Sequence, residues 1–108
     1  HLQEMIEETY NHPSVVVWGL CNEIPGKAPA AKHFARALFK AARRLDPSRP
    51  LTHASNTLHL GDPRDDVAGE MDFLSWNEYF ESWMGGSLAS MEAAAAKIRA
   101  AYPDKPLV

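Results

Sequence analysis

The sequence predicts an α/β fold in which helices cover a parallel sheet, and three observations carry this prediction. Helical spacing of apolar residues alternates along the chain with short apolar segments. The first of these segments, 14–21, contains three consecutive valines without alternation, as expected for a strand buried on both faces of a parallel sheet. The chain has 108 residues, and a further strand is expected to begin at 107–108. We therefore expect part of a (β/α)₈ barrel, which needs about 250 residues.

The elements of the first half follow from apolar spacing and from prolines. Residues 2–11 form a predicted amphipathic helix, and Pro13 ends it because a proline forces the preceding residue into an extended conformation. After the strand at 14–21, two prolines and a glycine indicate a loop at 24–30. A second helix follows over about 30–45, with two arginines in its last turn, where the helix dipole favours cations.

The second half repeats this alternation. The turn residues Asp, Pro and Ser introduce the next strand, and Ser87 is a suitable N-cap for the last helix. The expected order is a turn at 46–50, a strand at 51–55, a polar irregular stretch at 56–71, a strand at 73–76, a helix at 87–101 and a strand that begins at 107–108.

Composition excludes several classes of function. Hydrophobic residues make up 45%, charged residues 23%, and the net charge is -3, as in an ordinary globular protein. No basic stripe indicates nucleic acid, and the apolar runs are too short to cross a membrane. Cys21 is the single cysteine, so no internal disulfide is expected. No pattern indicates a cofactor, and the cellular compartment stays open.

Polar side chains follow each predicted strand. Asn22 and Glu23 follow the first, Asn56 ends the second, and Asn77 and Tyr79 end the third. The carboxyl ends of parallel strands meet at one edge of the sheet, where α/β proteins place their sites. Amides and carboxylates bind hydroxyl groups, and aromatic faces stack on the apolar side of a pyranose. The sequence therefore predicts a carbohydrate site.

The segment Asn-His-Pro-Ser-Val-Val-Val-Trp at 11–18, followed by Asn22 and Glu23, resembles the signature of family 2 glycoside hydrolases, which include β-glucuronidases and β-galactosidases. Residues 45–52 resemble the family's approach to the next strand, and residues 72–80 resemble the strand after that. The resemblance covers essentially the whole chain. It implies that residues 1–108 are a piece of the catalytic barrel, about strands 4 to 7.

The resemblance also implies roles for individual residues. Glu23 matches the general acid/base of a retaining enzyme, and Asn22 matches the amide that binds the sugar 2-hydroxyl. Asn77 and Tyr79 match residues that line the sugar subsite, with Tyr79 near the nucleophile. Trp83 and Asn56 are further candidates for sugar contacts; the Trp stands one place later than in the family pattern.

A retaining glycosidase needs two carboxyl groups about 5–5.5 Å apart. The resemblance places the second, the nucleophile, shortly after residues 105–108, so the 108-residue chain is expected to be inactive toward unactivated glycosides. The expected partners are a carbohydrate and the remainder of the barrel. The unpaired edges of such a part favour association, so an oligomer is one outcome that the sequence leaves open.

Other interpretations stay open beside this one. A noncatalytic carbohydrate-binding barrel module would keep the shape without turnover, and another barrel glycosidase with Asn-Glu on strand 4 would share the motif. Glu23 alone could be a solvated loop carboxylate, Asn22 an Asx turn, and Asn77 and Tyr79 structural residues. Structural hydrogen bonding is favoured for His53 and Asn56. Two further alternatives are disfavoured: a Cys21 thiol nucleophile and a metal site at His53, His59, Glu70 and Asp72.

Overall fold

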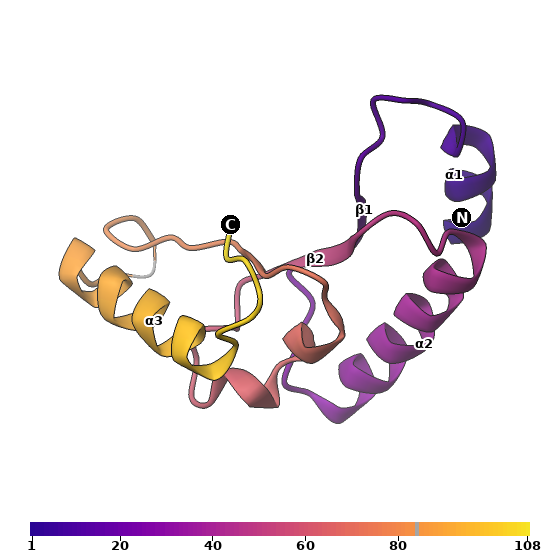
Figure 1. Ribbon diagram of the computed structural model, residues 1–108. Helices are drawn as coiled ribbons and strands as arrows, with labels where there is room; N and C mark the ends of the chain where they lie inside the picture. Colours follow the sequence, from indigo (N-terminus) through magenta and orange to yellow (C-terminus); the bar gives the residue numbers. More distant parts are fainter. Residues whose placement is uncertain (84) are drawn as a thin grey trace.

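The computed structural model describes residues 1–83 and 85–108. Helices and strands alternate along the chain as predicted (Figure 1). In chain order the elements are α1 Leu2–Thr9, β1 Trp18–Asn22, α2 Pro29–Leu45, β2 Leu51–Ser55, the 3₁₀ turns η1 Pro63–Asp65 and η2 Val67–Glu70, β3 Ser75–Trp76 and α3 Leu88–Ala101.

The sheet has three parallel strands in the order β1-β2-β3. Trp18 is paired with Leu51 at the start of the first pair, and Ala54 with Ser75 in the second. Leu107 forms an isolated parallel bridge with Leu74, on the side of β3 away from β2, which is consistent with the predicted start of a strand at 107–108. A parallel sheet in chain order, with α2 between β1 and β2 and α3 between β3 and the bridge at Leu107, is the arrangement of a section of a (β/α)₈ barrel.

The first strand is shorter and less buried than predicted. Pairing begins at Trp18, whose N–H donates to the carbonyl of Pro50 (3.0 Å), whereas Val15 closes a turn onto His12 (3.1 Å). Val16 is 69% exposed, and only the first residue of β1 is buried. The prediction of a strand at 14–21 buried on both faces is therefore wrong for these residues. The reason is position, because β1 is the edge strand of the described sheet.

The three helices lie close to their predicted ranges. α1 ends at Thr9, two residues early, where the side-chain hydroxyl bonds the carbonyl of Met5 (2.6 Å). α2 buries Ala35, Phe39 and Ala42. α3 begins after Ser87, whose hydroxyl accepts from the backbone N–H of residue 90 (3.3 Å) as predicted for an N-cap. None of the helices in the described part of the chain is long and apolar enough to span a membrane.

The stretch at 56–71 is not the polar loop that the sequence predicts. It contains η1 and η2, and it contributes four fully or nearly fully buried apolar side chains to the core: Leu58, Val67, Ala68 and Met71. Its apolar residues follow no helical or strand period, because prolines, glycines and aspartates separate them. β3 is likewise shorter than the predicted 73–76, with Leu74 in an isolated bridge.

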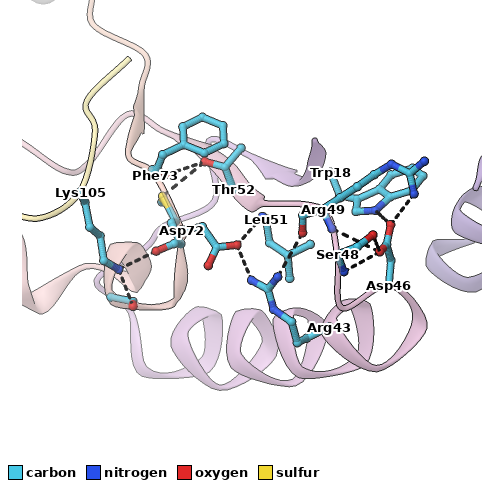
Figure 2. A network of polar contacts seen from close by, with 12 residues as sticks. Trp18, Arg43, Asp46, Ser48, Arg49, Leu51, Thr52, Asp72, Phe73 and Lys105 are labelled. Atoms are coloured by element: carbon cyan, nitrogen blue, oxygen red, sulfur yellow. Dashed lines mark hydrogen bonds and ion pairs between the residues drawn. The ribbon is translucent and has the colours of Figure 1, made fainter. Parts of the chain in front are cut away.

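Polar contacts tie the elements together at the amino ends of the strands (Figure 2). Asp46 is completely buried and accepts from the indole N–H of Trp18 (2.8 Å) and the guanidinium of Arg49 (2.7 Å). Farther along the same edge, Asp72 accepts from the backbone of Leu51 (2.7 Å) and pairs with Arg43 of α2. These contacts fix the starts of β1 and β2, and leave the opposite, carboxyl edge free to carry a site.

Candidate functional site

The carboxyl ends of β1 and β3 are brought together by β2, which lies between them. The backbone N–H of Glu23 donates to the carbonyl of Ala54 (2.8 Å), and the N–H of Asn77 donates to the carbonyl of Ser55 (3.0 Å). Two successive carbonyls of one strand thus hold the residues that follow the other two. The parallel register alone places side chains 54 residues apart in the sequence at one edge.

The predicted site residues of these strand ends form one hydrogen-bond network. The amide Nδ2 of Asn77 donates to Glu23 Oε1 (2.9 Å) and lies 3.2 Å from Asn22 Oδ1. The Tyr79 hydroxyl donates to the same oxygen of Glu23. The structure therefore brings together Glu23, Asn22, Asn77 and Tyr79. Tyr79, expected near the nucleophile, contacts Glu23 within the described residues.

The remaining two predicted residues, Asn56 and Trp83, line a cavity beside this network. A cavity of about 280 Å³ is lined by Glu23, Asn56, Tyr79 and Trp83. The Trp83 ring stands edge-on to the Tyr79 ring, with centroids 5.3 Å apart and planes at 88°. Trp83 is 81% exposed, so its indole borders the cavity and remains open to solvent. The cavity thus combines a carboxylate, an amide and two aromatic rings.

The backbone of Glu23 adopts a conformation that side-chain-bearing residues rarely take. Its φ is +50°, in the left-handed region, and it directly follows the last residue of β1. Such a conformation costs free energy and persists only where the surroundings hold it. It turns the chain out of the strand at the point where the carboxylate meets its two donors. Strain of this kind clusters at functional sites.

Hydrogen bonding shifts the pKa values of Glu23 and Tyr79. The bonds from Tyr79 and Asn77 lower the pKa of Glu23, since they stabilise the carboxylate, and this outweighs the opposing effect of burial. The same contact raises the pKa of the Tyr79 hydroxyl, because ionisation would place two negative charges together. At neutral pH the pair is a carboxylate and a neutral phenol.

The disfavoured alternatives gain no support in the described ranges. Cys21 is half-buried, and burial raises the pKa of its thiol, which keeps it protonated. No group of three or more His, Cys, Asp or Glu side chains in these ranges could hold a metal ion. Trp76 and Phe80 pack against each other and against His59, with ring centroids 5.7–6.0 Å apart. Neither Trp76 nor Phe80 is among the residues that line the cavity.

A polar layer that no sequence pattern predicts lies behind the cavity. Asp66 is 5% exposed and contacts Ser55 and Thr57 at the end of β2. His53, for which the sequence favours structural hydrogen bonding, is completely buried, but neither ring nitrogen has a hydrogen-bond partner among the described residues. No signal in the sequence separates Asp66 from its neighbours Asp62 and Asp65.

Comparison with known proteins places this geometry in a family. The model of the TIM barrel domain of glycosyl hydrolases family 2 matches residues 1–108. A β-glucuronidase from Rattus norvegicus is 35% identical over 69% of this chain and 12% of its own length. One from Streptococcus agalactiae is 30% identical over 99% of this chain and 19% of its own length.

Solved structures of β-glucuronidases share the fold of this chain. A β-D-glucuronidase from Dictyoglomus thermophilum superposes with a TM-score of 0.84 over 99% of this chain and 19% of its own, at 28% identity. A β-glucuronidase from Ruminococcus gnavus, solved in complex with D-glucuronic acid, gives a TM-score of 0.79 at 27% identity over 98% of this chain and 19% of its own. The chain spans less than a fifth of the length of these relatives. Because the model of the family's TIM barrel domain matches residues 1–108, the chain belongs to glycosyl hydrolases family 2 as part of that domain.

Proposed function

We propose that this chain forms part of a retaining β-glycoside hydrolase in which Glu23 is the general acid/base. One observation carries the proposal: Glu23 stands at the carboxyl end of β1, bonded by Asn77 and Tyr79, and borders a cavity with an exposed indole. The relatives are named β-glucuronidases, and one was solved with D-glucuronic acid. β-Glucuronides are therefore the first substrates to test, followed by β-galactosides.

The reaction needs Glu23 in two charge states. As an acid it protonates the glycosidic oxygen, and as a carboxylate it then accepts a proton from the attacking water. The bonds from Tyr79 and Asn77 lower its pKa and so favour the carboxylate. The acid form requires an opposing influence, which a second carboxylate about 5–5.5 Å away supplies. We assign that nucleophile to the strand that begins at 107–108, at a position after Val108.

The other residues bind and orient the sugar in this proposal. Asn22 and Asn77 offer amide groups to its hydroxyls, with Asn22 at the 2-hydroxyl. Asn56 offers a further amide at the cavity rim. Trp83 and Tyr79 present a T-shaped aromatic pair, and the exposed indole provides the flat face on which a sugar ring or the aglycone stacks.

The test is the dependence of the rate on the leaving group, measured in a complete barrel that contains residues 1–108. Glu23→Gln keeps the size of the side chain but has no acidic proton. We expect kcat/KM for a phenyl β-glycoside to fall by about 10²–10⁴-fold, since this leaving group needs protonation. The value for a dinitrophenyl β-glycoside should change far less, because that leaving group departs as a stable anion.

The matched control is Glu92→Gln, the same substitution on the exposed face of α3. It should change neither value. Equal losses on both substrates, or full activity of Glu23→Gln toward the phenyl glycoside, would remove Glu23 from the acid/base role. A wild-type barrel that binds glucuronides but turns over neither substrate would favour the noncatalytic carbohydrate-binding interpretation.

A further inference from the structure

Behind the cavity, the chain buries a carboxylate that the chemistry above does not use. The side chain of Asp66, between η1 and η2, has no exposed surface. Thr57 Oγ1 donates to it at 2.5 Å, and Ser55 Oγ lies 3.4 Å away. The ring of His53 approaches to 3.9 Å, too far for a hydrogen bond but close enough for an electrostatic contact. Placing a carboxylate here costs desolvation energy, so its contacts call for an explanation.

The carboxylate presses against the loop that follows Glu23. A Cβ atom on Gly26 would lie 2.7 Å and 2.8 Å from the two carboxylate oxygens and 2.9 Å from Asp66 Cγ. Distances this short leave no room for any side chain at that position while Asp66 stays in place. The adjacent Lys27 donates to the carbonyl of Asp62 (2.5 Å), so two successive residues hold the loop to the same stretch of chain.

Asp66 contacts two segments that position the proposed acid/base: the loop after Glu23, at Gly26, and the end of β2, at Ser55. Gly26 stands three residues after Glu23, whose left-handed backbone depends on what holds the loop in place. On the other side, Ser55 approaches the carboxylate with its hydroxyl, while its carbonyl accepts from the backbone of Asn77. Asp66 thus lies against the segment that follows Glu23 and against the end of β2, where the Ser55 carbonyl accepts from the backbone of Asn77.

We propose that Asp66 is a positioning residue for Glu23, fixing through Gly26 and Ser55 the geometry in which Glu23 meets Asn77 and the substrate. The proposal rests on the acid/base role assigned to Glu23 above. An error of about 1 Å in the position of a reacting group can cost 10²-fold in rate. A buried carboxylate wedged behind the loop limits such errors.

The charge of Asp66 is maintained by its surroundings. Burial raises the pKa of this carboxyl, but His53, Thr57 and the positive charge of Lys27 together hold the pKa below its ordinary value. Burial raises the pKa of the Tyr102 hydroxyl, and the negative charge of Asp66 raises it further. Asp66 is therefore an acceptor of hydrogen bonds at neutral pH and cannot be replaced by its amide without turning one acceptor into a donor.

The first test is Asp66→Asn in the complete barrel, with Asp65→Asn as its matched control. Asp65 is the exposed neighbour, and its substitution makes the same change of charge. We expect Asp66→Asn to lower kcat/KM for a phenyl β-glycoside by at least about 10-fold, with a much smaller change for the dinitrophenyl glycoside. Partial unfolding would lower both values equally, so this selectivity is specific to a displaced acid. Asp65→Asn should leave both unchanged.

A second test keeps the proposal falsifiable if Asp66→Asn does not fold. Gly26→Ala adds only a methyl group, and we expect the same selective loss. Asp66→Ala removes the atoms that this methyl would meet, so Gly26→Ala should cost little further activity in the Asp66→Ala background. Additive losses, or a loss that is equal for both substrates, would overturn the proposal.

The two proposals fail in different ways. If Glu23→Gln keeps its activity on the phenyl glycoside, the acid/base assignment is wrong. If Glu23→Gln shows the selective loss and neither Asp66→Asn nor Gly26→Ala does, Glu23 keeps its role and Asp66 loses the one inferred for it.

Discussion

A single side chain, Glu23, receives two hydrogen bonds on one oxygen. The donors are the Tyr79 hydroxyl and the Asn77 amide, both from the segment after β3. Their effect on charge is opposite to what an acid catalyst needs, because they stabilise the carboxylate. The residue-scale picture is therefore a carboxylate held in place by donors, whose protonation depends on a further negative charge.

Replacing the first of these donors gives a direct prediction. Tyr79→Phe removes the largest influence that lowers the pKa of Glu23, so that pKa should rise. The measurement is an NMR titration of the Glu23 carboxyl in the 108-residue chain. Tyr10→Phe, on the exposed side of the segment after α1, is the control and should leave the titration unchanged. A pKa of Glu23 that stays constant or falls in Tyr79→Phe would contradict the network.

The same titration compares the pKa of Glu23 in the 108-residue chain with its pKa in a complete barrel. In a complete barrel the proposed nucleophile adds a like charge near Glu23, and like charges raise the pKa of a carboxyl. We therefore expect Glu23 to titrate at lower pH in the 108-residue chain than in the complete barrel. Equal pKa values in the two would argue against a second carboxylate close to Glu23.

Single residues are predictable where they follow strands. The polar side chains at the strand ends predict from the sequence alone that Glu23, Asn77 and Tyr79 are neighbours, and the structure brings them together. Their roles in catalysis stay predictions. The role proposed for Asp66 is not predictable, because it depends on burial and on contact with Gly26. The sequence does not show which of Asp62, Asp65 and Asp66 is buried.

Among the elements, the starts of β1 and β2 depend on one buried ion pair. Asp46 accepts from Trp18, from Arg49 and from Ser48, whose hydroxyl lies 2.6 Å away. Arg49 also donates to the carbonyls of residues 10 and 15 (2.6 and 2.7 Å), which holds the segment between α1 and β1. Contacts at the amino face of a barrel serve stability rather than catalysis.

We predict that Asp46→Ala lowers the free energy of unfolding by at least about 2 kcal/mol, because it leaves the Trp18 indole without its acceptor and Arg49 without its opposite charge. Equilibrium unfolding in urea measures this change. Asp104→Ala, on the exposed turn before the last strand, removes the same charge and should change stability by less than about 0.5 kcal/mol. Equal unfolding midpoints for the two variants would contradict the assigned network.

The pH dependence of stability follows from the same carboxyl. Burial raises the pKa of Asp46, but the hydrogen bonds from Ser48, Arg49 and Trp18 outweigh this effect and hold the pKa well below its ordinary value. A carboxyl whose pKa is depressed by folding stabilises the protein above the unfolded pKa, about 3.9, and this stability is lost as the pH falls. Urea midpoints should therefore fall with pH below about 4, and less steeply in Asp46→Ala than in the wild type.

The elements show which sequence patterns carry reliable information. Helical spacing predicts α2 and α3 nearly to the residue, since a period of 3.6 extends over many turns. The predicted start of β1 is wrong by four residues, because three valines predict an extended chain but not where pairing begins. That point is set by the carbonyl of Pro50, a long-range contact. The buried stretch at 56–71 escapes prediction because its apolar residues have no period.

At the scale of the whole molecule, a groove larger than the cavity of the proposed site lies elsewhere on the chain. A groove of about 660 Å³ runs along α1, β1 and α2, and its apolar lining includes Leu2, Met5, Leu20, Phe34 and Leu38. It adjoins β1, which has no partner on its outer edge among the described residues. In a barrel the neighbouring strand and helix cover such a face. The fold class is predictable from alternation alone, whereas this open face depends on which part of the barrel is present.

The groove predicts how the 108-residue chain behaves in solution. Exposed apolar surface beside an unpaired strand edge favours association, so the apparent mass in sedimentation should rise with concentration. Phe34→Lys, which puts a charge into the groove, should reduce this association. Leu88→Lys, at an exposed position of α3 outside the groove, should not. A chain that stays monomeric at all concentrations, or equal effects of the two variants, would contradict this use of the groove.

The most direct measurement of the central claim uses an external nucleophile. In a complete barrel, Glu23→Ala removes the base that activates water, so the glycosyl-enzyme formed from a dinitrophenyl β-glucuronide should accumulate. Azide attacks without needing a base. We predict that azide restores turnover of this variant and that the product is the β-glucuronosyl azide, with retained configuration. No acceleration by azide, or an α-configured product, would contradict the assignment of Glu23 as the acid/base of a retaining glycosidase.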